Sequence, residues 1–192
     1  MMAAEHDSKA DAPTPPMASV YLRPPVVTDE AEFVSVMGQS REFHRRWAVA
    51  PTSHERFIAY LRDGQRPDFE ARLVCRREDD AIVGFFNLSQ ISPGPVRSAY
   101  LGYAAAMPYA GQGYMREAIK PMLCLAFNEL QIKWLEANIQ ATNEASIALA
   151  RRAGFTLPGS PSRYLKISGR WRDHQRWVLS REDWQRSGGE AR

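Results

Sequence analysis

The chain of 192 residues is poor in the residues that build metal sites and disulfide frameworks, with only two cysteines and four histidines. Cys75 and Cys124 lie far apart, each inside an apolar segment, so we expect two buried thiols rather than a disulfide. The histidines show no metal-ligand spacing to one another or to the cysteines; they are His6, His44, His54 and His174. We therefore predict no metal site.

The sequence also lacks a long apolar run, since no stretch approaches the roughly 18 residues that a membrane-spanning helix needs. Its opening stretch, MMAAEHDSKADAPTPP, has acidic residues where a secretory signal has its positive end, and no apolar block follows. We therefore expect a soluble, cytoplasmic protein with no membrane partner.

Hydrophobic residues make up 44% of the chain and charged residues 24%, values that are typical of a globular protein and exclude a fibrous or wholly disordered one. The length fits a single domain. Residues 1–19 are rich in Ala, Asp, Pro and Ser without apolar periodicity, which predicts a disordered tail. We expect one folded domain over 20–184 and a flexible tail over 185–192.

The net charge of +3 is unevenly distributed. From Arg151 onward, ten basic residues face four acidic ones, a net charge of +6 in this last stretch. Such a region is either a solvated surface or a surface that meets a polyanion, for example a nucleotide phosphate or the ribosome. We expect no specific binding of nucleic acid.

The first half of the chain changes from helical to strand patterns. A short strand at 20–23 is followed by a helix capped by Thr28 or Asp29, and a second helix runs from about 52 to 64. Alternating or β-branched runs at 71–76, 82–88 and 100–104 have short connections between them. They predict an antiparallel meander.

The second half predicts a crossover and a closing hairpin. A long helix from Tyr114 to about Leu130 should bend at Pro121, and a strand at 133–139 leads to a helix opened by Thr142 and Asn143. Strands at 164–167 and 175–179 follow. The order predicts a mixed α/β domain: one twisted, mostly antiparallel sheet flanked by about four helices.

The most informative segment is Gly111-Gln112-Gly113, which joins a strand to a helix. Glycines let the backbone approach a ligand, and a helix start offers unpaired N–H groups that suit phosphate oxygens. The segment is either such a phosphate site or only a tight connection. It is neither a P-loop, because no Gly-Lys-Ser/Thr follows, nor a dinucleotide motif, because Arg116 replaces the third glycine.

A wider set of residues is more specific. The set consists of five segments in chain order: Tyr-Leu-Gly-Tyr at 100–103, Gly-Gln-Gly-Tyr-Met-Arg-Glu-Ala at 111–118, Asn-Glu-Ala-Ser at 143–146, Ala-Gly-Phe at 153–155 and Gly-Arg-Trp-Arg-Asp-His at 169–174. This pattern resembles the GNAT superfamily of acetyl-CoA-dependent N-acetyltransferases, and within it the ribosomal-protein alanine acetyltransferases (RimJ/RimL). The resemblance covers about 20–184 and implies a sheet with a splayed parallel strand pair.

The resemblance implies acetyl-CoA as cosubstrate, with no metal. Its pyrophosphate would lie on backbone N–H groups of the glycine turn, and its pantetheine arm along the preceding strand and Asn143. The implied cofactor-binding residues are Ala104, Ala105, Ala106, Gly111, Gln112, Gly113, Tyr114, Met115 and Asn143. Ala110 stands where the family has Gln or Arg, so we expect weaker cofactor binding. Helix capping is an alternative role for Asn143.

Three side chains are candidates for catalysis. Ser146 matches a serine near the thioester sulfur, although it also suits a helix start. Tyr100 stands where many relatives carry a glutamate base, and we expect it to orient water. Glu136 is the nearest alternative carboxylate, or else a surface residue.

The acceptor side is less determined. Phe43, Trp47, Asn87 and Ser89 are candidate substrate-binding residues, although core packing would also explain the aromatic ones. Acetyl transfer to the N-terminal α-amine of a protein, plausibly ribosomal, is the leading hypothesis. The alternatives are acetylation of a small amine, such as an antibiotic or toxin, and a non-catalytic acyl-CoA-binding module. Both a monomer and a homodimer are compatible with the sequence.

Overall fold

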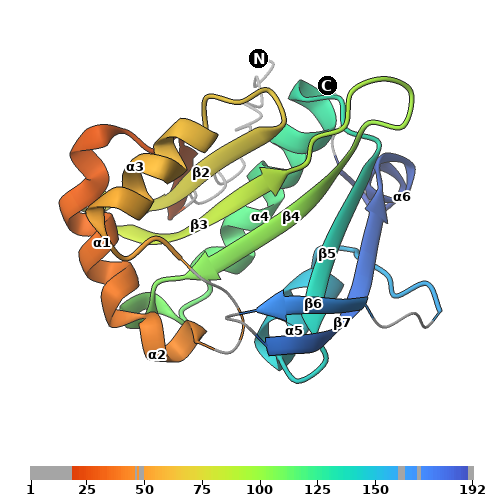
Figure 1. The fold of residues 1–192 in the computed structure, drawn as a ribbon. Helices are drawn as coiled ribbons and strands as arrows, with labels where there is room; N and C mark the ends of the chain where they lie inside the picture. Colours follow the sequence, from red (N-terminus) through yellow and green to blue (C-terminus); the bar gives the residue numbers. More distant parts are fainter. Residues whose placement is uncertain (1–18, 46, 48–49, 160–162, 168–169, 190–192) are drawn as a thin grey trace, which may run out of the picture.

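The computed structural model describes residues 19–45, 47, 50–159, 163–167 and 170–189. Within these residues, seven strands form one sheet in the order β1-β2-β3-β4-β5-β7-β6 (Figure 1). They are β1 (Val20–Arg23), β2 (Phe69–Arg76), β3 (Ile82–Ser89), β4 (Ser98–Ala105), β5 (Trp134–Gln140), β6 (Arg163–Ile167) and β7 (Arg170–Ser180). Only β4 and β5 pair in parallel; every other neighbouring pair is antiparallel. The mixed α/β class and the meander are confirmed.

The described residues form six α-helices, two more than the sequence indicated. They are α1 (Glu30–Gln39), α2 (Arg41–His44), α3 (His54–Asp63), α4 (Tyr114–Cys124), α5 (Glu144–Arg152) and α6 (Arg181–Arg186), with 3-10 turns η1 (Val27–Asp29) and η2 (Met107–Tyr109). The additional helices, α2 and α6, are too short to show a periodic apolar pattern.

The long helix expected from Tyr114 runs past Pro121 and then changes its hydrogen-bonding pattern. Beyond Cys124 it becomes a π-helical segment, η3 (Leu125–Glu129), in which the Leu130 amide donates to the Leu125 carbonyl at 2.9 Å. Pro121 has no amide hydrogen for the Glu117 carbonyl, yet it lies inside α4, and the irregular segment begins only four residues beyond it.

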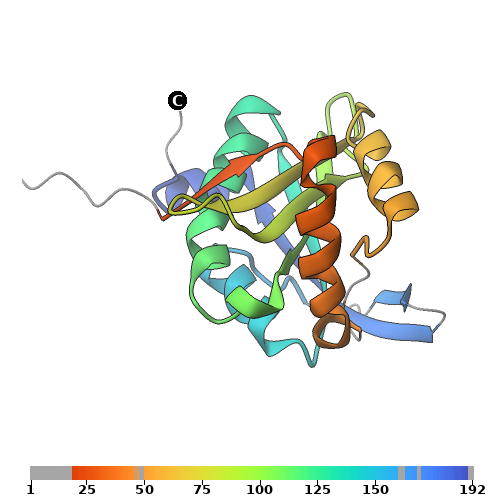
Figure 2. The same ribbon diagram turned by 90° about the vertical axis from the view of Figure 1, so that its left-hand side faces the viewer.

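Each face of the sheet has its own hydrophobic core. On one face, α1 and α3 place Phe33 and Phe57, which are fully buried with ring centroids 5.3 Å apart, against the sheet. On the other face lie α4 and α5 (Figure 2). They cover a larger core that includes Phe86, Met122 and Trp177. Alternating side chains of the central strands supply both cores, as expected for a sheet covered on both sides.

The ends of the chain fall largely outside the described residues. The tail expected at 1–19 is described only at Ser19, and residues 190–192 of the expected C-terminal tail are likewise outside. Within 185–189, Gln185 and Arg186 belong to α6, and the Gly189 amide donates to the Trp184 carbonyl. Cys75 is buried and Cys124 is partly buried, and neither forms a disulfide within the described part of the chain.

Candidate active site

The centre of the site is the point where β4 and β5 part. Their register holds three pairs, from Ser98 opposite Trp134 to Tyr100 opposite Glu136. Beyond Tyr100, β4 continues against β3 alone and β5 against β7 alone, and the two strands diverge visibly (Figure 1). The expected splayed parallel pair is therefore present.

The divergence leaves backbone groups of β4 directed into the gap. The Ala106 amide donates to the Val83 carbonyl at 2.9 Å. Together with the register, this bond identifies the residues of β4 whose backbone groups form hydrogen bonds to β3. Because an antiparallel ladder alternates, the amide and carbonyl groups of Tyr103 and Ala105 point away from β3. A ligand with amide groups of its own can lie along them like an added strand.

The glycine turn opens α4 at the same end of the gap. Gly111 and Gly113 have φ values of 78° and 92°, in the left-handed region that side chains rarely adopt, and Gly113 is the N-cap. The first intrahelical bond of α4 runs from the Glu117 amide to the Gly113 carbonyl at 3.0 Å. The three amides before it, in residues 114–116, have no helical acceptor and are available to an anion.

A third glycine brings this helix start against the sheet. A Cβ on Gly84 of β3 would lie 2.5 Å from Met115 Sδ and 2.7 Å from the Ala104 carbonyl oxygen. Only a residue without a side chain permits this approach of α4 to β3 and β4. The sequence alone does not distinguish this glycine from others, because its role depends on a helix about 30 residues further along.

One cleft of about 550 Å³ joins the gap to the glycine turn. Two arginines, Arg116 of α4 and Arg152 of α5, lie in its wall, and Glu144 is the one carboxylate among its described lining residues. The Arg116 guanidinium lies beside the glycine turn, 3.8 Å from the place that a Cβ on Gly113 would take. The cleft therefore combines helical N–H groups and positive charge at one end with strand backbone at the other. This combination suits a ligand with phosphates and an amide-bearing arm.

The cleft brings together most of the candidate residues. Its lining includes Phe43, Trp47, Ala104, Ala105, Gly111, Gln112, Gly113, Tyr114, Met115, Asn143 and Ser146. Ala106 is fully buried and is not part of the lining. Asn143 Oδ1 accepts a hydrogen bond from the Ser146 amide at 3.2 Å, so Asn143 does cap α5. The Tyr103 hydroxyl donates to the Ser146 carbonyl at 2.9 Å and so bridges the gap.

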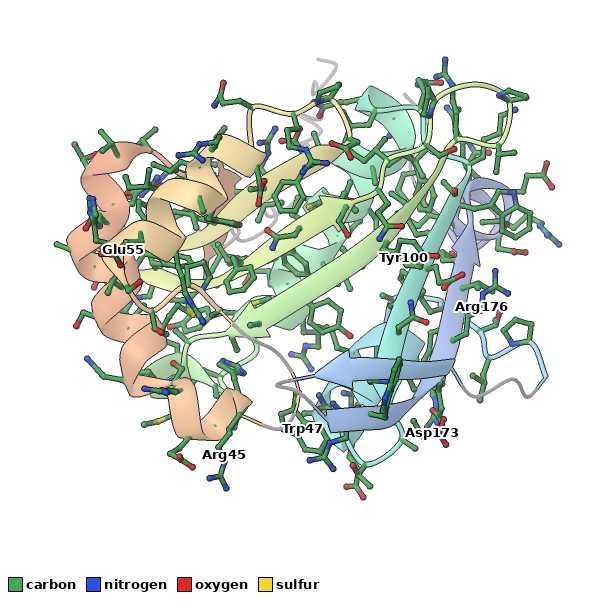
Figure 3. All side chains as sticks on the ribbon, viewed as in Figure 1. Arg45, Trp47, Glu55, Tyr100, Asp173 and Arg176 are labelled. Carbon is green, nitrogen blue, oxygen red and sulfur yellow. The ribbon has the colours of Figure 1, made fainter. Side chains whose placement is uncertain are left out.

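Tyr100 and Glu136 form the last pair before the strands part, and neither lines the cleft. Figure 3 shows Tyr100 on β4, well away from Trp47. The Glu136 carboxylate is mostly buried; it forms an ion pair with Arg176 of β7 and accepts a hydrogen bond from Asn138 Nδ2 at 3.2 Å. These contacts use Glu136 to join β5 to β7. A catalytic role for either residue stays a prediction.

Asn87 and Ser89 also lie outside the cleft lining. Asn87 Oδ1 accepts a hydrogen bond from the Tyr60 hydroxyl at 2.7 Å, beneath α3. Burial raises the pKa of Tyr60, so this phenol stays protonated and keeps donating. The bond gives Asn87 a structural partner, and its role toward substrate stays a prediction.

The structure adds a residue that the sequence did not indicate as functional. His44, at the end of α2, lines the cleft with only 7% of its surface exposed, and its Nε2 lies 2.7 Å from the Ala105 carbonyl oxygen. Burial lowers the pKa of His44, and the bond to Ala105 only partly opposes this effect. No periodic pattern marks a histidine in a four-residue helix, so the fold was needed to find it.

The described residues contain neither a metal-binding cluster nor a helix that could span a membrane. No group of three or more His, Cys, Asp or Glu side chains is arranged to hold a metal ion among them. No helix in the same part of the chain is long and apolar enough to cross a bilayer.

The sequence of the chain is similar to those of known acetyltransferases. Residues 19–156 match the family model described as "Acetyltransferase (GNAT) domain". The probable N-acetyltransferase YjcK of Bacillus subtilis is 29% identical over 169 residues, which cover 82% of this chain and 91% of that protein. The ribosomal protein uS5-alanine N-acetyltransferase of Escherichia coli is 33% identical over 107 residues, or 56% of this chain and 55% of that protein.

Solved structures show the same fold. RimJ of Mycobacterium smegmatis, in complex with CoA-disulfide, superposes with a TM-score of 0.76 at 21% identity, covering 90% of each chain. Spermidine N-acetyltransferase of Vibrio cholerae, in complex with CoA and spermine, superposes with a TM-score of 0.74 at 17% identity, covering 87% of this chain and 98% of that one. At these identities the superpositions establish the fold alone.

Proposed function

The chain belongs to the GNAT acetyltransferase family, and from this premise we propose that it transfers the acetyl group of acetyl-CoA to the N-terminal α-amine of a protein. The amine attacks the thioester directly, with both substrates bound at once. The observation that carries the proposal is a cleft in which a row of unpaired helical amides continues into the gap between β4 and β5.

The cofactor's pyrophosphate lies on the glycine turn in this proposal. The amides of Tyr114, Met115 and Arg116 donate to its oxygens, and the guanidinium groups of Arg116 and Arg152 supply positive charge. Ala110 contributes no side-chain contact, so backbone donors and these arginines bear most of the interaction.

The pantetheine arm lies along β4 in the same proposal. Its amides pair with the backbone groups of Tyr103 and with the Ala105 amide, which face the gap, since the Ala105 carbonyl already accepts from His44 Nε2. Asn143 Oδ1 is already used as a helix cap, so only its Nδ2 donor reaches toward the arm. This arrangement brings the thioester to the part of the cleft lined by Ser146.

Acetyl transfer needs only a weak base and one hydrogen-bond donor from the protein when the acceptor is an α-amine. An α-amino group has a pKa of about 8, against about 10.4 for a lysine amine, so its deprotonation at neutral pH is cheaper by roughly 3 kcal/mol. The departing thiol has a pKa of about 8.5, which one hydroxyl donor can serve. We assign that donor to Ser146 Oγ. Holding the two substrates in line supplies much of the remaining acceleration.

The choice of acceptor is supported by the relatives and by the charge of the cleft. A curated relative at 33% identity is named for acetylation of an alanine of ribosomal protein uS5. A polyamine carries several positive charges and requires carboxylates, whereas the described lining has one carboxylate, Glu144, and two arginines. The excess of basic residues after Arg151 suits an acceptor on the ribosome.

The test is release of CoA thiol by the purified protein with acetyl-CoA and one of three acceptors. These are peptides with a free N-terminal alanine, the same peptides with a blocked N-terminus and a free lysine, and spermidine. We expect turnover only with the first set, with mass spectrometry placing the acetyl group on the α-amine.

Turnover with spermidine alone would show that the acceptor is a polyamine and not the N-terminus of a protein. If CoA binds but no amine reacts, including the ribosomal proteins of an extract, the chain is an acyl-CoA-binding module and the proposal fails. Substitution of Gly113 by Glu, which blocks the cofactor site, identifies any thiol release that does not depend on this cleft.

A further inference from the structure

The hydrogen bond between His44 and Ala105 determines which ring nitrogen of His44 carries a proton. His44 Nε2 lies 2.7 Å from the Ala105 carbonyl oxygen, and a carbonyl oxygen only accepts hydrogen bonds. Nε2 therefore carries the hydrogen and donates it. In the neutral ring the lone pair is then on Nδ1. Among the residues that the structure describes, none donates a hydrogen bond to Nδ1.

The surroundings of His44 favour this neutral form. The side chain is buried, which lowers its pKa. The titratable groups that share the cleft with it are Tyr103, Tyr109, Tyr114, Glu144, Arg116 and Arg152. On the adjoining turns of the chain lie Arg41, Glu42 and Arg45, of which Arg45 pairs with Glu42 at 3.4 Å. The balance of these charges is positive, with Arg116 and Arg152 against Glu144 in the cleft and Arg41 and Arg45 against Glu42 beside it.

His44 is held firmly at the open end of the gap. The buried Ser40 hydroxyl, just before α2, donates to the Val36 carbonyl at 2.6 Å and accepts from the Met107 amide at 2.8 Å. This bond joins the start of α2 to the chain just beyond β4. Since Ala105 has its backbone groups in the gap, the imidazole lies against the strand along which the thioester arm is proposed to run.

We propose that His44 is the catalytic base, and that its Nδ1 takes the proton which the acceptor nitrogen loses during acetyl transfer. The proposal rests on the function proposed above. The neutral amine attacks the thioester carbon, the N–C bond forms and the C–S bond breaks. The nitrogen's surplus proton passes to His44 Nδ1. The CoA thiolate leaves with the electron pair, accepts a hydrogen bond from Ser146 Oγ and takes its proton from water. The resulting imidazolium still donates through Nε2 to Ala105 and loses its proton to solvent.

His44→Gln tests the base without removing the contact to β4. The amide nitrogen of glutamine can replace Nε2 as donor to the Ala105 carbonyl, but the side chain cannot accept a proton. We expect CoA affinity within about twofold of the unsubstituted protein, and kcat with an N-terminal peptide lower by about 100-fold or more.

The pH profile distinguishes a base from a structural contact. In the unsubstituted protein, kcat should fall as the pH is lowered through the pKa of His44, which lies below its usual value of about 6.5. This acid limb should be absent from His44→Gln. His54→Gln, which changes an exposed histidine of α3 bonded to Glu30, is the matched control and should keep both kcat and the limb.

A second variant keeps the proposal testable if His44→Gln folds poorly. His44→Ala leaves space in the cleft, and added imidazole should restore kcat in proportion to its unprotonated fraction. If His44→Gln keeps the full kcat and its acid limb, or if imidazole restores nothing to a folded His44→Ala, His44 is not the base. An unsubstituted protein that acetylates no amine would instead overturn the proposed function itself.

Discussion

Gly113 is the residue at which the start of α4 and the proposed pyrophosphate site coincide. Its φ of 92° disfavours any side chain, and the nearest group to the place that a Cβ would take is the Arg116 guanidinium, at 3.8 Å. A carboxylate here would point into the cleft among the amides that are proposed to bind phosphate. The position therefore combines a conformational and an electrostatic constraint.

We expect Gly113→Glu to weaken CoA binding by at least about 100-fold, which corresponds to roughly 2.7 kcal/mol. Isothermal titration calorimetry with CoA measures the change. Gly38→Glu is the matched control, because Gly38 is exposed on α1 with nothing within 4 Å of an added Cβ, and it should bind CoA normally. Equal affinity in the two variants would place the phosphates elsewhere.

Ser146 has backbone contacts that hold it in place and a proposed catalytic hydroxyl, and one substitution can separate the two. Its backbone is fixed by Asn143 Oδ1 and by the Tyr103 hydroxyl, contacts that an alanine retains. Ser146→Ala should therefore fold and bind CoA normally while kcat falls by about 10- to 100-fold, because the thiolate loses its donor. Steady-state kinetics together with CoA titration test this, with Ser35→Ala on the exposed face of α1 as control. Loss of CoA binding in Ser146→Ala would indicate a structural hydroxyl.

The site residues differed in how far the sequence could predict them. Gly111, Gly113 and Asn143 were found because glycines and a capping residue leave a local signal at a helix start. His44 has no such local signal, because its place in the cleft depends on a hydrogen bond to Ala105, which is 61 residues away. Asn87 was predicted to bind substrate from its position in a strand. Its Oδ1 instead accepts a hydrogen bond from the Tyr60 hydroxyl of α3, and the packing of that helix cannot be predicted from a local pattern.

At the scale of elements, β1 is tied to the start of α1 by one carboxylate. Arg23 donates to both oxygens of Asp29 at 2.7 and 2.6 Å, and the Val26 amide donates to the same group at 2.7 Å. Burial raises the pKa of Asp29, but these three bonds outweigh burial and hold the pKa below its usual value. The ionised form is therefore the one that stabilises the fold.

Asp29→Asn should lower the free energy of unfolding by about 1–3 kcal/mol at pH 7. A group with a depressed pKa contributes stability above its unfolded pKa, about 3.9, and loses it as the pH falls. The difference between the two proteins should therefore shrink below about pH 4. Urea unfolding at pH 7 and pH 3 measures it. Asp63→Asn, which removes an exposed partner of Arg66, should change stability by under about 1 kcal/mol at both.

The elements themselves were predicted best where their patterns are long. The helix from Ser53 and the strands of the meander follow local periodicity and caps, and the structure has them within a few residues. Strand β7 begins at Arg170, earlier than the expected 175, because its first residues pair with β6 rather than with the core. Such a hairpin extension has no apolar alternation to reveal it.

At the scale of the whole molecule, the cleft draws its walls from both arms of the sheet. Phe43 and His44 come from the side of β1–β4, while Asn143 and Ser146 come from the side of β5–β7. Three residue pairs and the Tyr103 hydroxyl join β4 to the far side directly. A cofactor that contacts both walls should therefore stabilise the molecule as a unit.

CoA at 100 times its dissociation constant should raise the free energy of unfolding by about 2.7 kcal/mol. For a chain of this length that corresponds to a rise in Tm of about 5–10 °C. Differential scanning fluorimetry with increasing CoA measures the shift, and adenosine without phosphates should produce almost none. A single transition that does not move with CoA would contradict binding in the cleft.

The parting of β4 and β5 also affects the protein before any substrate arrives. Backbone groups in mid-sheet are left open to whatever extended chain comes near, a hazard that proteins usually confine to the outermost strands of a sheet. A saturating pool of cofactor would shield them. The solubility of this enzyme should therefore rise with the concentration of CoA, and preparations without CoA should self-associate at lower protein concentrations than preparations with it.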